Sequence, residues 1–361
     1  MSACAGRHFD LTHRIGPGEK KEDIPMAKFR LGKTELMVEK QGFGCLPIQR
    51  CTKEEAAALL RRAVDGGMNY FDSARGYSDS EEKIGYALHD VRDRIYLATK
   101  SHAQTGKELT AHLETSLRNL QTDHIDVYQF HNPAFCPKPG GEDGLYDAAL
   151  KAQQEGKIRF ISITNHRLSV AHEAIDSGLY ATLQFPFSYL SGPQEMELVE
   201  KCRKTDMGFI AMKGMAGGLI QDGYTASAFM ETQPDVLPIW GVQRDRELDQ
   251  FLECVKHPAI MTEERRATIE RDRKELTGDF CRGCGYCMPC PVGIEINNCA
   301  RMSLMLRRAP TSQWLSPAWQ EKMEMIRNCL HCGHCASKCP YGLNTPKLLQ
   351  ANYEDYQTFL K

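Results

Sequence analysis

The 361-residue sequence has no excess of charge of one sign and no long apolar run. Its 45 basic and 47 acidic residues leave a formal net charge of −2, which gives no electrostatic reason to expect nucleic acid or an anionic membrane as a partner. No apolar stretch approaches the roughly 20 residues that a membrane-spanning helix needs. The first residues also lack the basic start, apolar centre and cleavage site of a secretory signal, so we expect a cytoplasmic protein.

Cysteine, in contrast, is abundant. The chain has 15 cysteines, and eight of them crowd into two short runs near the C-terminus. A disulfide framework is typical of small secreted domains and does not suit a long chain without a secretory signal. The two runs therefore call for a different explanation, and metal ligation is the one that their spacing favours.

The two runs share a spacing typical of iron–sulfur proteins. They are Cys281-x₂-Cys284-x₂-Cys287-x₂-Cys290-Pro and Cys329-x₂-Cys332-x₂-Cys335-x₃-Cys339-Pro. Three cysteines in step let one loop present three thiolates to one cubane, while the fourth, before proline, ligates the other cluster. The sequence therefore predicts two [4Fe–4S] clusters. The predicted ligands of the first are Cys281, Cys284, Cys287 and Cys339, and those of the second are Cys290, Cys329, Cys332 and Cys335.

Zinc is the main alternative, because zinc sites also use Cys-x₂-Cys pairs. A zinc site needs two such pairs, not a third cysteine in step and a fourth before proline, so iron–sulfur is favoured. The first run has two residues before its last cysteine, where the commonest pattern has three. Cys299 is therefore an alternative ligand to Cys290, although it lies in an expected helix, where a packed role is favoured.

Ahead of these runs, short apolar segments alternate with amphipathic ones. The strand candidates are 41–48, 68–74, 94–100, 124–131, 158–165, 181–187, 208–214 and 236–242. One intervening helix begins at Thr52 with Glu55 three residues on, a capping-box pattern. Parallel strands need long crossovers, so eight such units predict an α/β fold, a (β/α)₈ TIM barrel.

The expected domains follow from this pattern. They are an N-terminal extension without regular structure (1–25), the barrel (26–257), a connecting helix (258–277) and a small, mostly helical ferredoxin-like domain (278–361). Two helices are expected in the spacer between the cysteine runs.

Four residues of the barrel segment follow a known pattern. The segments NYFDSARGY, YLATK and YQFHN resemble the aldo-keto reductase family, which has an Asp, a Tyr five residues later, a Lys closing the next strand and a His closing the one after. The matching positions are Asp72, Tyr77, Lys100 and His131. The resemblance covers about residues 28–255. With the cysteine runs, the chain resembles the subgroup of this family that has a C-terminal ferredoxin-like domain.

The resemblance implies an NAD(P)H-dependent oxidoreductase that reduces a small carbonyl or oxidises an alcohol. Tyr77 would donate the proton, Lys100 would lower its pKa, and Asp72 would hold Lys100. His131 would orient the carbonyl. Independently of the family, Asp72, Lys100 and His131 each fall at the C-terminal end of a predicted strand, where barrel enzymes keep their chemistry.

The resemblance also implies a nicotinamide site. Its candidate residues are Asn165, Gln184, Met212, Lys213, Gly214, Gly217, Gly241, Arg244 and Arg246. Asn165 and Gln184 would hold the carboxamide, and the glycines would let the backbone approach the pyrophosphate. An arginine at the adenosine end favours NADP(H) over NAD(H), whereas two solvated surface charges explain Arg244 and Arg246 equally well.

Three functions remain open from the sequence. The chain is a reductase whose clusters pass electrons to or from a redox protein, an electron-transfer protein whose barrel is a docking or regulatory platform, or a conventional reductase with structural clusters. The four barrel residues argue against the second function, and two clusters argue against the third. Hydride carries two electrons and a cluster carries one, so coupling them normally needs a flavin or radical step, and the sequence has no flavin signature.

Overall fold

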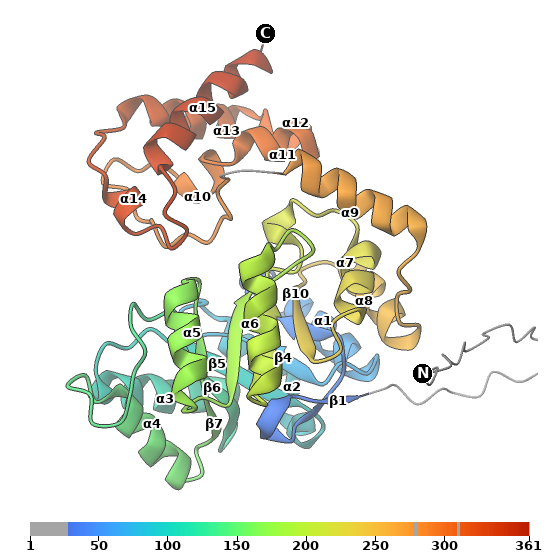
Figure 1. Ribbon diagram of the computed structural model, residues 1–361, viewed down its shortest axis with the longest axis vertical. Helices are drawn as coiled ribbons and strands as arrows, with labels where there is room; N and C mark the ends of the chain where they lie inside the picture. Colours follow the sequence, from blue (N-terminus) through green and yellow to red (C-terminus); the bar gives the residue numbers. More distant parts are fainter. Residues whose placement is uncertain (1–27, 277–279, 309–310, 361) are drawn as a thin grey trace, which may run out of the picture.

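The computed structural model describes residues 28–276, 280–308 and 311–360, which form a strand–helix barrel and a smaller helical unit (Figure 1). The expected extension over 1–25 lies outside the described residues. In Figure 1 the helical unit, in orange and red, lies above the barrel and is joined to it by a long helix. This arrangement sets the loops at one end of the barrel against the cysteine-bearing segments.

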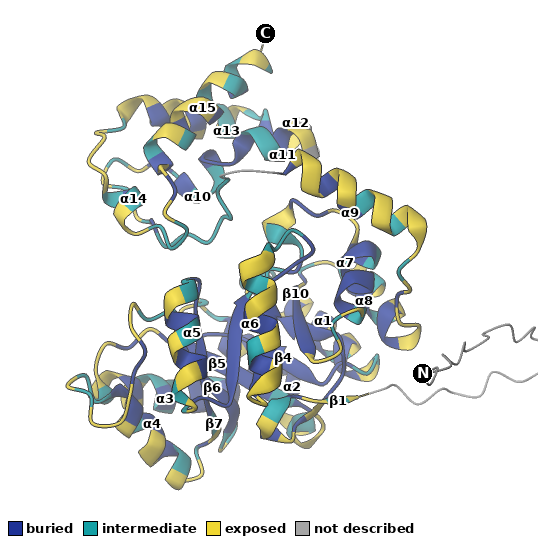
Figure 2. Ribbon diagram, viewed as in Figure 1, coloured by how far each residue is buried: buried dark blue, intermediate teal, exposed yellow. Residues whose placement is uncertain are grey.

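Eight parallel strands close into a barrel in the order β10-β3-β4-β5-β6-β7-β8-β9. Their bounds are β3 (Gly42–Gly44), β4 (Tyr70–Asp72), β5 (Tyr96–Ser101), β6 (Ile125–His131), β7 (Ile158–Thr164), β8 (Thr182–Pro186), β9 (Gly208–Met212) and β10 (Val236–Gly241). Each lies within a predicted strand segment, apart from one residue at the end of β5, so the predicted (β/α)₈ barrel is confirmed. Every residue of β6 is buried, as both faces of a parallel strand require (Figure 2).

Helices cover the outside of the barrel. They are α1 (Lys53–Asp65), α2 (Ser80–Leu88), α3 (Gly106–Leu120), α4 (Leu145–Gln154), α5 (Leu168–Ser177), α6 (Pro193–Lys204), α7 (Gly223–Glu231) and α8 (Asp245–Lys256). The predicted capping box is confirmed, because the Thr52 side chain accepts from the Glu55 backbone and the Glu55 side chain accepts from the Thr52 backbone. The apolar stripe of α1, which includes Leu59 and Leu60, is buried against the sheet.

A hairpin that the sequence did not predict precedes the barrel. Its strands β1 (Phe29–Arg30) and β2 (Met37–Val38) pair antiparallel, and Leu31 and Leu36 between them join the apolar interior of the barrel. Gly32 has a φ of +52°, and a Cβ there would lie 2.2 Å from the backbone nitrogen of Gly208. The close approach explains why glycine stands at this turn.

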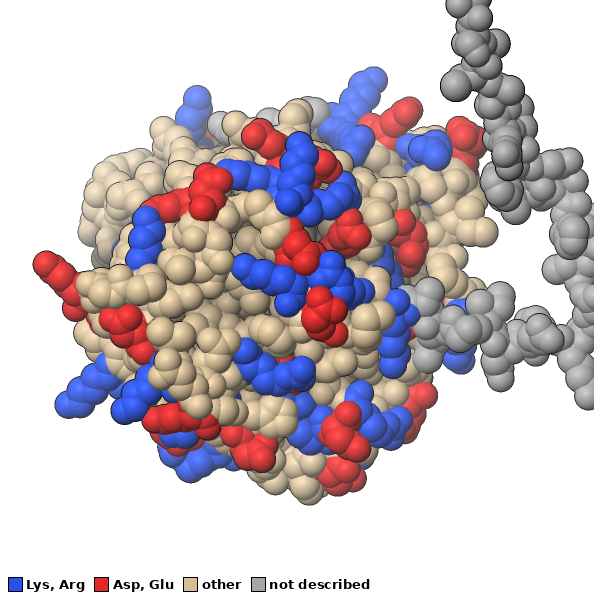
Figure 3. Space-filling model, turned by 60° about the horizontal axis from the view of Figure 1, so that its bottom comes forward, with Lys and Arg blue, Asp and Glu red and all other residues tan. Residues whose placement is uncertain are grey.

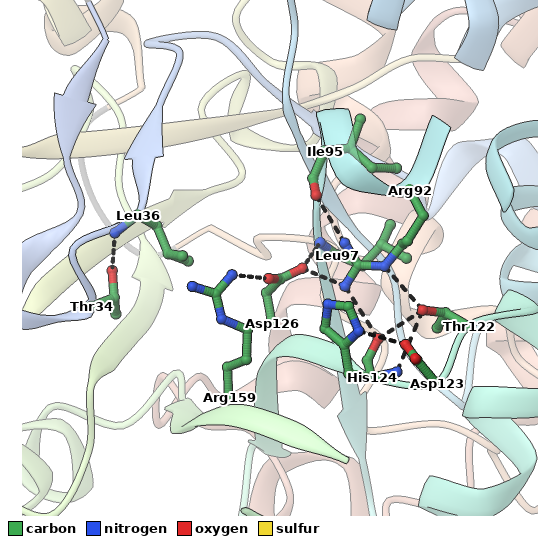
Figure 4. Close-up of polar contacts among 10 residues, drawn as sticks. All are labelled: Thr34, Leu36, Arg92, Ile95, Leu97, Thr122, Asp123, His124, Asp126 and Arg159. Carbon is green, nitrogen blue, oxygen red and sulfur yellow. Dashed lines mark hydrogen bonds and ion pairs between the residues drawn. The ribbon is translucent and has the colours of Figure 1, made fainter. Parts of the chain in front are cut away.

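The amino-terminal end of the barrel also holds a buried polar network (Figure 4). Asp126, at the start of β6, accepts from Arg92 and from Arg159 at 2.6 Å each, and from the backbone nitrogen of Leu97 at 2.9 Å. These bonds compensate the burial of the carboxylate. They lie at the opposite end of β6 from His131, so this network is structural.

The connecting helix is α9 (Glu263–Glu275), shorter than the predicted range 258–277. Its Asp272 accepts from the Tyr189 hydroxyl, and its Arg273 donates to the Tyr189 carbonyl at 2.6 Å. Tyr189 follows β8, so α9 is fastened to the loop end of the barrel where the cysteine unit lies.

The C-terminal unit has its own apolar core. Its described elements are α10 (Ile296–Cys299), α11 (Met302–Arg308), α12 (Thr311–Trp314), α13 (Pro317–Glu324), a 3₁₀ turn (Met325–Asn328), α14 (His334–Ser337) and α15 (Thr345–Thr358). The prediction of two helices between the cysteine runs was wrong, because the described spacer contains four short α-helices. Pro317 at the start of α13 is one cause, since proline is favoured at a helix start and not inside one.

Figure 3 shows Lys and Arg interspersed with Asp and Glu over one face of the molecule. Many charged side chains of the described residues form ion pairs, as Arg62 does with Asp249 at 2.6 Å. Across the described part of the chain, no helix combines the length and apolar character needed to cross a bilayer.

Candidate functional site

A buried ion pair lies at the carboxyl ends of β4 and β5. The Nζ of Lys100 donates to Oδ2 of Asp72 at 2.6 Å and also to the carbonyl of Ser73. The side chains of Lys100 and Asp72 are only 1% and 3% exposed. Because two neighbouring parallel strands supply them, the barrel fixes the position of the ammonium group.

Tyr77 and His131 complete the predicted set. Tyr77 lies in the turn after β4, and its ring centre is 5.1 Å from the Nζ of Lys100. The same ring meets the imidazole of His131, at the end of β6, edge to face at 5.8 Å between ring centres. The structure therefore brings all four predicted residues together.

The electrostatics of Tyr77 differ from the expectation. Burial raises the pKa of the Tyr77 phenol, and the nearby Asp72 and Cys45 raise it further. The expected lowering by Lys100 is not among these influences on the pKa of Tyr77, and the Lys100 ammonium is itself paired with Asp72. The phenol consequently keeps its proton at neutral pH, which suits a proton donor.

His131 is held as a neutral imidazole. Burial lowers its pKa well below the usual value, and the neighbouring His102, Lys100 and His166 lower it further. A neutral ring can donate one hydrogen bond without carrying charge. His102, which the sequence reasoning missed, stacks on His131 with 3.7 Å between ring centres. Its place two residues after Lys100 was the available signal.

Two glutamines surround the carboxylate of Asp72. Gln129 donates to Oδ1 at 3.2 Å, and Gln184 donates to Oδ2 at 3.5 Å. Burial raises the pKa of Asp72, while Lys100 and the two amides oppose that rise. The Oε1 of Gln184 and the Nδ1 of His131 are buried without a hydrogen-bond partner among the described residues. Such atoms fit a site built to receive a polar group.

Asn165, the other predicted carboxamide ligand, is engaged by its own loop. Its Nδ2 donates to the carbonyl of Pro133 at 2.8 Å, and its Oδ1 accepts from the backbone nitrogens of His166 and Arg167. The side chain thus shapes the turn after β7. Of the two predicted carboxamide residues, Gln184 is the one with an unused oxygen.

The loop after β9 is close-packed against the chain itself. Its predicted residues run from Met212, which ends β9, through Lys213, which has a φ of +60°. A Cβ at Gly214 would lie 2.6 Å from the Trp240 ring, and one at Gly217 would lie 2.7 Å from Nη1 of Arg301. These glycines therefore serve internal packing, and their expected contact with a cofactor stays a prediction.

The remaining predicted cofactor residues follow β10, the neighbour of β9 in the barrel. Gly241 ends β10, and α8 begins at Asp245, as the expected helix start after Gln243 requires. Arg244 is 54% exposed and lies 3.9 Å from Glu247, and Arg246 is exposed as well. Both arginines are exposed, at the same end of the barrel as the buried ion pair.

The cysteines gather around two cavities. One is lined by Cys281, Cys284, Cys287 and Cys339. The other is lined by Cys290, Cys329, Cys332 and Cys335. These groups are the two predicted ligand sets, each with its fourth cysteine from the other run. They are called the first and second cysteine sets below.

Cys299, the alternative ligand to Cys290, is buried in α10 and lines neither cavity. Apolar side chains, among them Val292, Ile294 and Leu349, complete the wall of the second cavity. In the described ranges, no three His, Cys, Asp or Glu side chains converge as ligands of a single metal ion.

The first cysteine set lies against the barrel. Tyr286, between two of its cysteines, meets His166 edge to face at 4.8 Å, and Tyr341 meets the same imidazole at 6.0 Å. His166 follows Asn165 and is 4% exposed. Arg301 donates to the Gly217 carbonyl at 2.8 Å. The sequence reasoning missed these four contact residues, although Tyr286 stands inside the first cysteine run and Tyr341 directly follows the second.

Comparison with known proteins identifies a family for each of the two units. Residues 41–262 match the Aldo/keto reductase family, and residues 280–344 match the 4Fe-4S dicluster domain. The chain belongs to the aldo/keto reductase family. The predicted resemblance to aldo-keto reductases with a C-terminal ferredoxin-like domain is therefore confirmed. The predicted class of enzyme, an oxidoreductase, is confirmed as well.

Curated relatives of this aldo/keto reductase include proteins that are 28% identical to it. An uncharacterized oxidoreductase of Bacillus subtilis (strain 168), YqkF, is 28% identical over 233 residues, which cover 57% of this chain and 74% of that one. L-galactose dehydrogenase of Arabidopsis thaliana is 28% identical over 211 residues, which cover 53% and 66%. These relatives align with little more than half of this chain.

Solved structures resemble the barrel. An aldo-keto reductase from Bacillus halodurans in its holo form superposes with a TM-score of 0.61 at 22% identity, covering 70% of this chain and 98% of that one. An aldo-keto reductase from Klebsiella pneumoniae in complex with NADPH has a TM-score of 0.57 at 23% identity, covering 69% and 95%. At this identity the likeness establishes the fold.

Proposed function

We propose that this aldo/keto reductase reduces a small carbonyl with a nicotinamide cofactor and uses two [4Fe–4S] clusters for electron transfer. The observation that carries the proposal is the joint position of the two sites. Asp72, Tyr77, Lys100 and His131 meet at the loop end of the barrel. The loop of the first cysteine set packs onto His166 at that same end.

The barrel residues have distinct roles in this proposal. Tyr77 keeps its proton and donates it to the oxygen on which negative charge develops. His131, held neutral, orients the carbonyl by a hydrogen bond. Asp72 compensates the buried charge of Lys100. The Lys100 ammonium stabilises the phenolate that Tyr77 becomes when it donates its proton. The nicotinamide, when bound, supplies the hydride.

Several features support a nicotinamide site on the same end. The unused Oε1 of Gln184 fits an amide donor, and the fold is shared with a Klebsiella pneumoniae protein solved with NADPH. Arg244 and Arg246 stand exposed at the start of α8, where an arginine would grip a 2′-phosphate. We therefore propose NADP(H) over NAD(H).

The two cysteine cavities support the cluster assignment. Each brings four thiols together from both runs, as the shared ligation of two cubanes requires. The first set would hold the cluster near the barrel, and the second the cluster farther along the unit. Such clusters exchange single electrons, and an apolar wall like that of the second cavity limits solvent access.

An anaerobic titration with NADPH and with NADH, followed in the visible, tests the proposal. We expect a brown protein with about eight irons per chain, bleaching by NADPH, and turnover of small aldehydes or quinones. Turnover without bleaching would favour clusters that only fasten the two units together. A colourless protein with two zinc ions would contradict the cluster assignment.

Tyr77→Phe tests the barrel separately. We expect carbonyl turnover to fall by about 10²–10⁴-fold, the usual worth of a positioned proton donor. Tyr86→Phe is the matched control, because Tyr86 is 45% exposed on α2, away from the four residues. Full turnover by the Tyr77 variant would remove Tyr77 from the proton-donor role.

A further inference from the structure

A buried arginine joins the barrel to the cysteine unit. Arg301 immediately precedes α11 and is only 9% exposed. Its Nη1 donates to the carbonyl of Gly217, in the loop after β9, at 2.8 Å. Its Nη2 donates to Oδ1 of Asn298 within the cysteine unit at 3.3 Å. One guanidinium thus holds both units.

The same guanidinium lies on the first cysteine loop. A Cβ at Gly283 would meet the Cζ of Arg301 at 2.7 Å, so the backbone between Cys281 and Cys284 is in direct contact with the charge. Burial lowers the pKa of Arg301, and these two thiols act in the opposite direction. Arginine stays charged in proteins, so a positive charge is fixed beside the predicted ligands.

That charge has no carboxylate partner among the described residues, and its Nε is buried without a hydrogen-bond partner there. Lys213, on the barrel side, adds a second cation within electrostatic reach of Arg301 and Cys284. A buried cation is costly unless an anion compensates it. Four thiolates around a cubane carry a net negative charge, and they are the anion that this position offers.

We infer that Arg301 is a positioning residue that joins the loop after β9 to the first cysteine set and, through its charge, raises the reduction potential of the cluster that this set holds. This inference rests on the proposed function, because it needs the cluster. Reduction adds one electron and hence one negative charge. A fixed cation nearby stabilises the reduced form more than the oxidised form, most strongly where water is excluded.

The test is an anaerobic redox titration of the full chain with a one-electron mediator, followed by electron paramagnetic resonance. In Arg301→Gln we expect the reduction equilibrium of one of the two clusters to weaken by about tenfold or more. For one electron this corresponds to a reduction potential lower by about 59 mV or more. The other potential should stay in place. Arg301→Lys, which keeps the charge, should retain most of the wild-type value.

Arg307→Gln is the matched control. It also removes one positive charge, but from the surface of α11, where Arg307 pairs with Asp355 and is 51% exposed. Equal shifts in the Arg301 and Arg307 variants would reduce the effect to net charge and overturn the inference. Two unchanged potentials in Arg301→Gln, with both clusters loaded, would overturn it as well.

A second variant covers the case in which Arg301→Gln does not load its cluster. In Gly217→Ala the added methyl would press on Nη1 from 2.7 Å and displace the guanidinium without removing it. A smaller fall of the same potential is expected, and no change would overturn the inference. A wild-type protein without iron would instead contradict the proposed function, so the two failures are distinguishable.

Discussion

The buried pair of Lys100 and Asp72 leads to a prediction about stability. Lys100→Met keeps an unbranched apolar side chain in the barrel but removes the ammonium that lies 2.6 Å from Asp72. The carboxyl then stays buried with the amides of Gln129 and Gln184 as its described partners. A buried charge that loses its counter-charge destabilises the folded state.

The magnitude follows from the geometry. Two unit charges 2.6 Å apart attract by about 6 kcal/mol at an effective dielectric constant of about 20. Breaking one partner of a buried pair costs about 3–5 kcal/mol, less than the full attraction because the site relaxes. We expect a loss in that range, out of a total free energy of unfolding of about 5–15 kcal/mol.

The loss should depend on pH. Burial already raises the pKa of Asp72, and removing Lys100 takes away the main influence that lowers it. A carboxyl whose pKa is higher in the folded than in the unfolded chain stabilises the fold below its unfolded pKa. That contribution is lost as the pH rises through the folded pKa. The deficit of Lys100→Met should therefore grow from acidic to neutral pH.

Urea unfolding of the anaerobic protein, followed by circular dichroism, measures the effect. Arg62→Met is the matched control, since it breaks an ion pair with Asp249 in which both side chains are 44–59% exposed, and we expect at most about 1 kcal/mol. The double variant with Asp72→Asn should lose less than the sum of the single variants. A Lys100→Met loss as small as the control, or strictly additive losses, would refute the reasoning.

Three further predictions concern the clusters, the pH profile and the contact between the units. Cys339→Ser should lower the iron content from about eight to about four per chain, with the cluster of the first run lost, because Cys339 lines the cavity of that set; an iron assay that finds the second run's cluster missing would contradict the shared ligation. The kcat/KM profile should show no acidic limb at about pH 6–7, because burial holds the pKa of His131 well below its usual value; a limb there that disappears in His131→Asn would be inconsistent with this. Tyr286→Ala should weaken the contact with His166 by about 0.5–1.5 kcal/mol, seen as a lower temperature of cluster bleaching than in the exposed-site control Met196→Ala.

The sequence located the barrel because its strands differ from its helices in a simple way. Buried parallel strands are short apolar runs, and the helices between them carry caps such as Thr52 and Glu55. The sequence did not predict the first hairpin, because strands of two residues are too short to show the apolar–polar alternation of a strand. It also predicted too few helices in the spacer after Cys290, because helices of four residues carry almost no periodic signal.

The candidate site could be predicted from the sequence only in part, namely where local pattern fixes the position of a residue. Strand ends fix where Asp72, Lys100 and His131 lie, so their meeting could be predicted. The direction of the shift in the pKa of Tyr77 could not, because it depends on burial and on the nearby Asp72 and Cys45. Likewise, the packing of Gly214 against Trp240 became visible only in three dimensions.

The sequence by itself determined the chemistry that this chain carries: eight cysteines in cluster spacing, four barrel residues of an oxidoreductase family, and the order of the two units. These are local patterns, and the spacing of nearby residues can be seen directly in the sequence. Only the tertiary structure decided how the units meet. Arg301 on Gly217 and Tyr286 on His166 join residues more than 80 positions apart. Such contacts depend on the complementary shapes of two folded surfaces, and no local pattern encodes them.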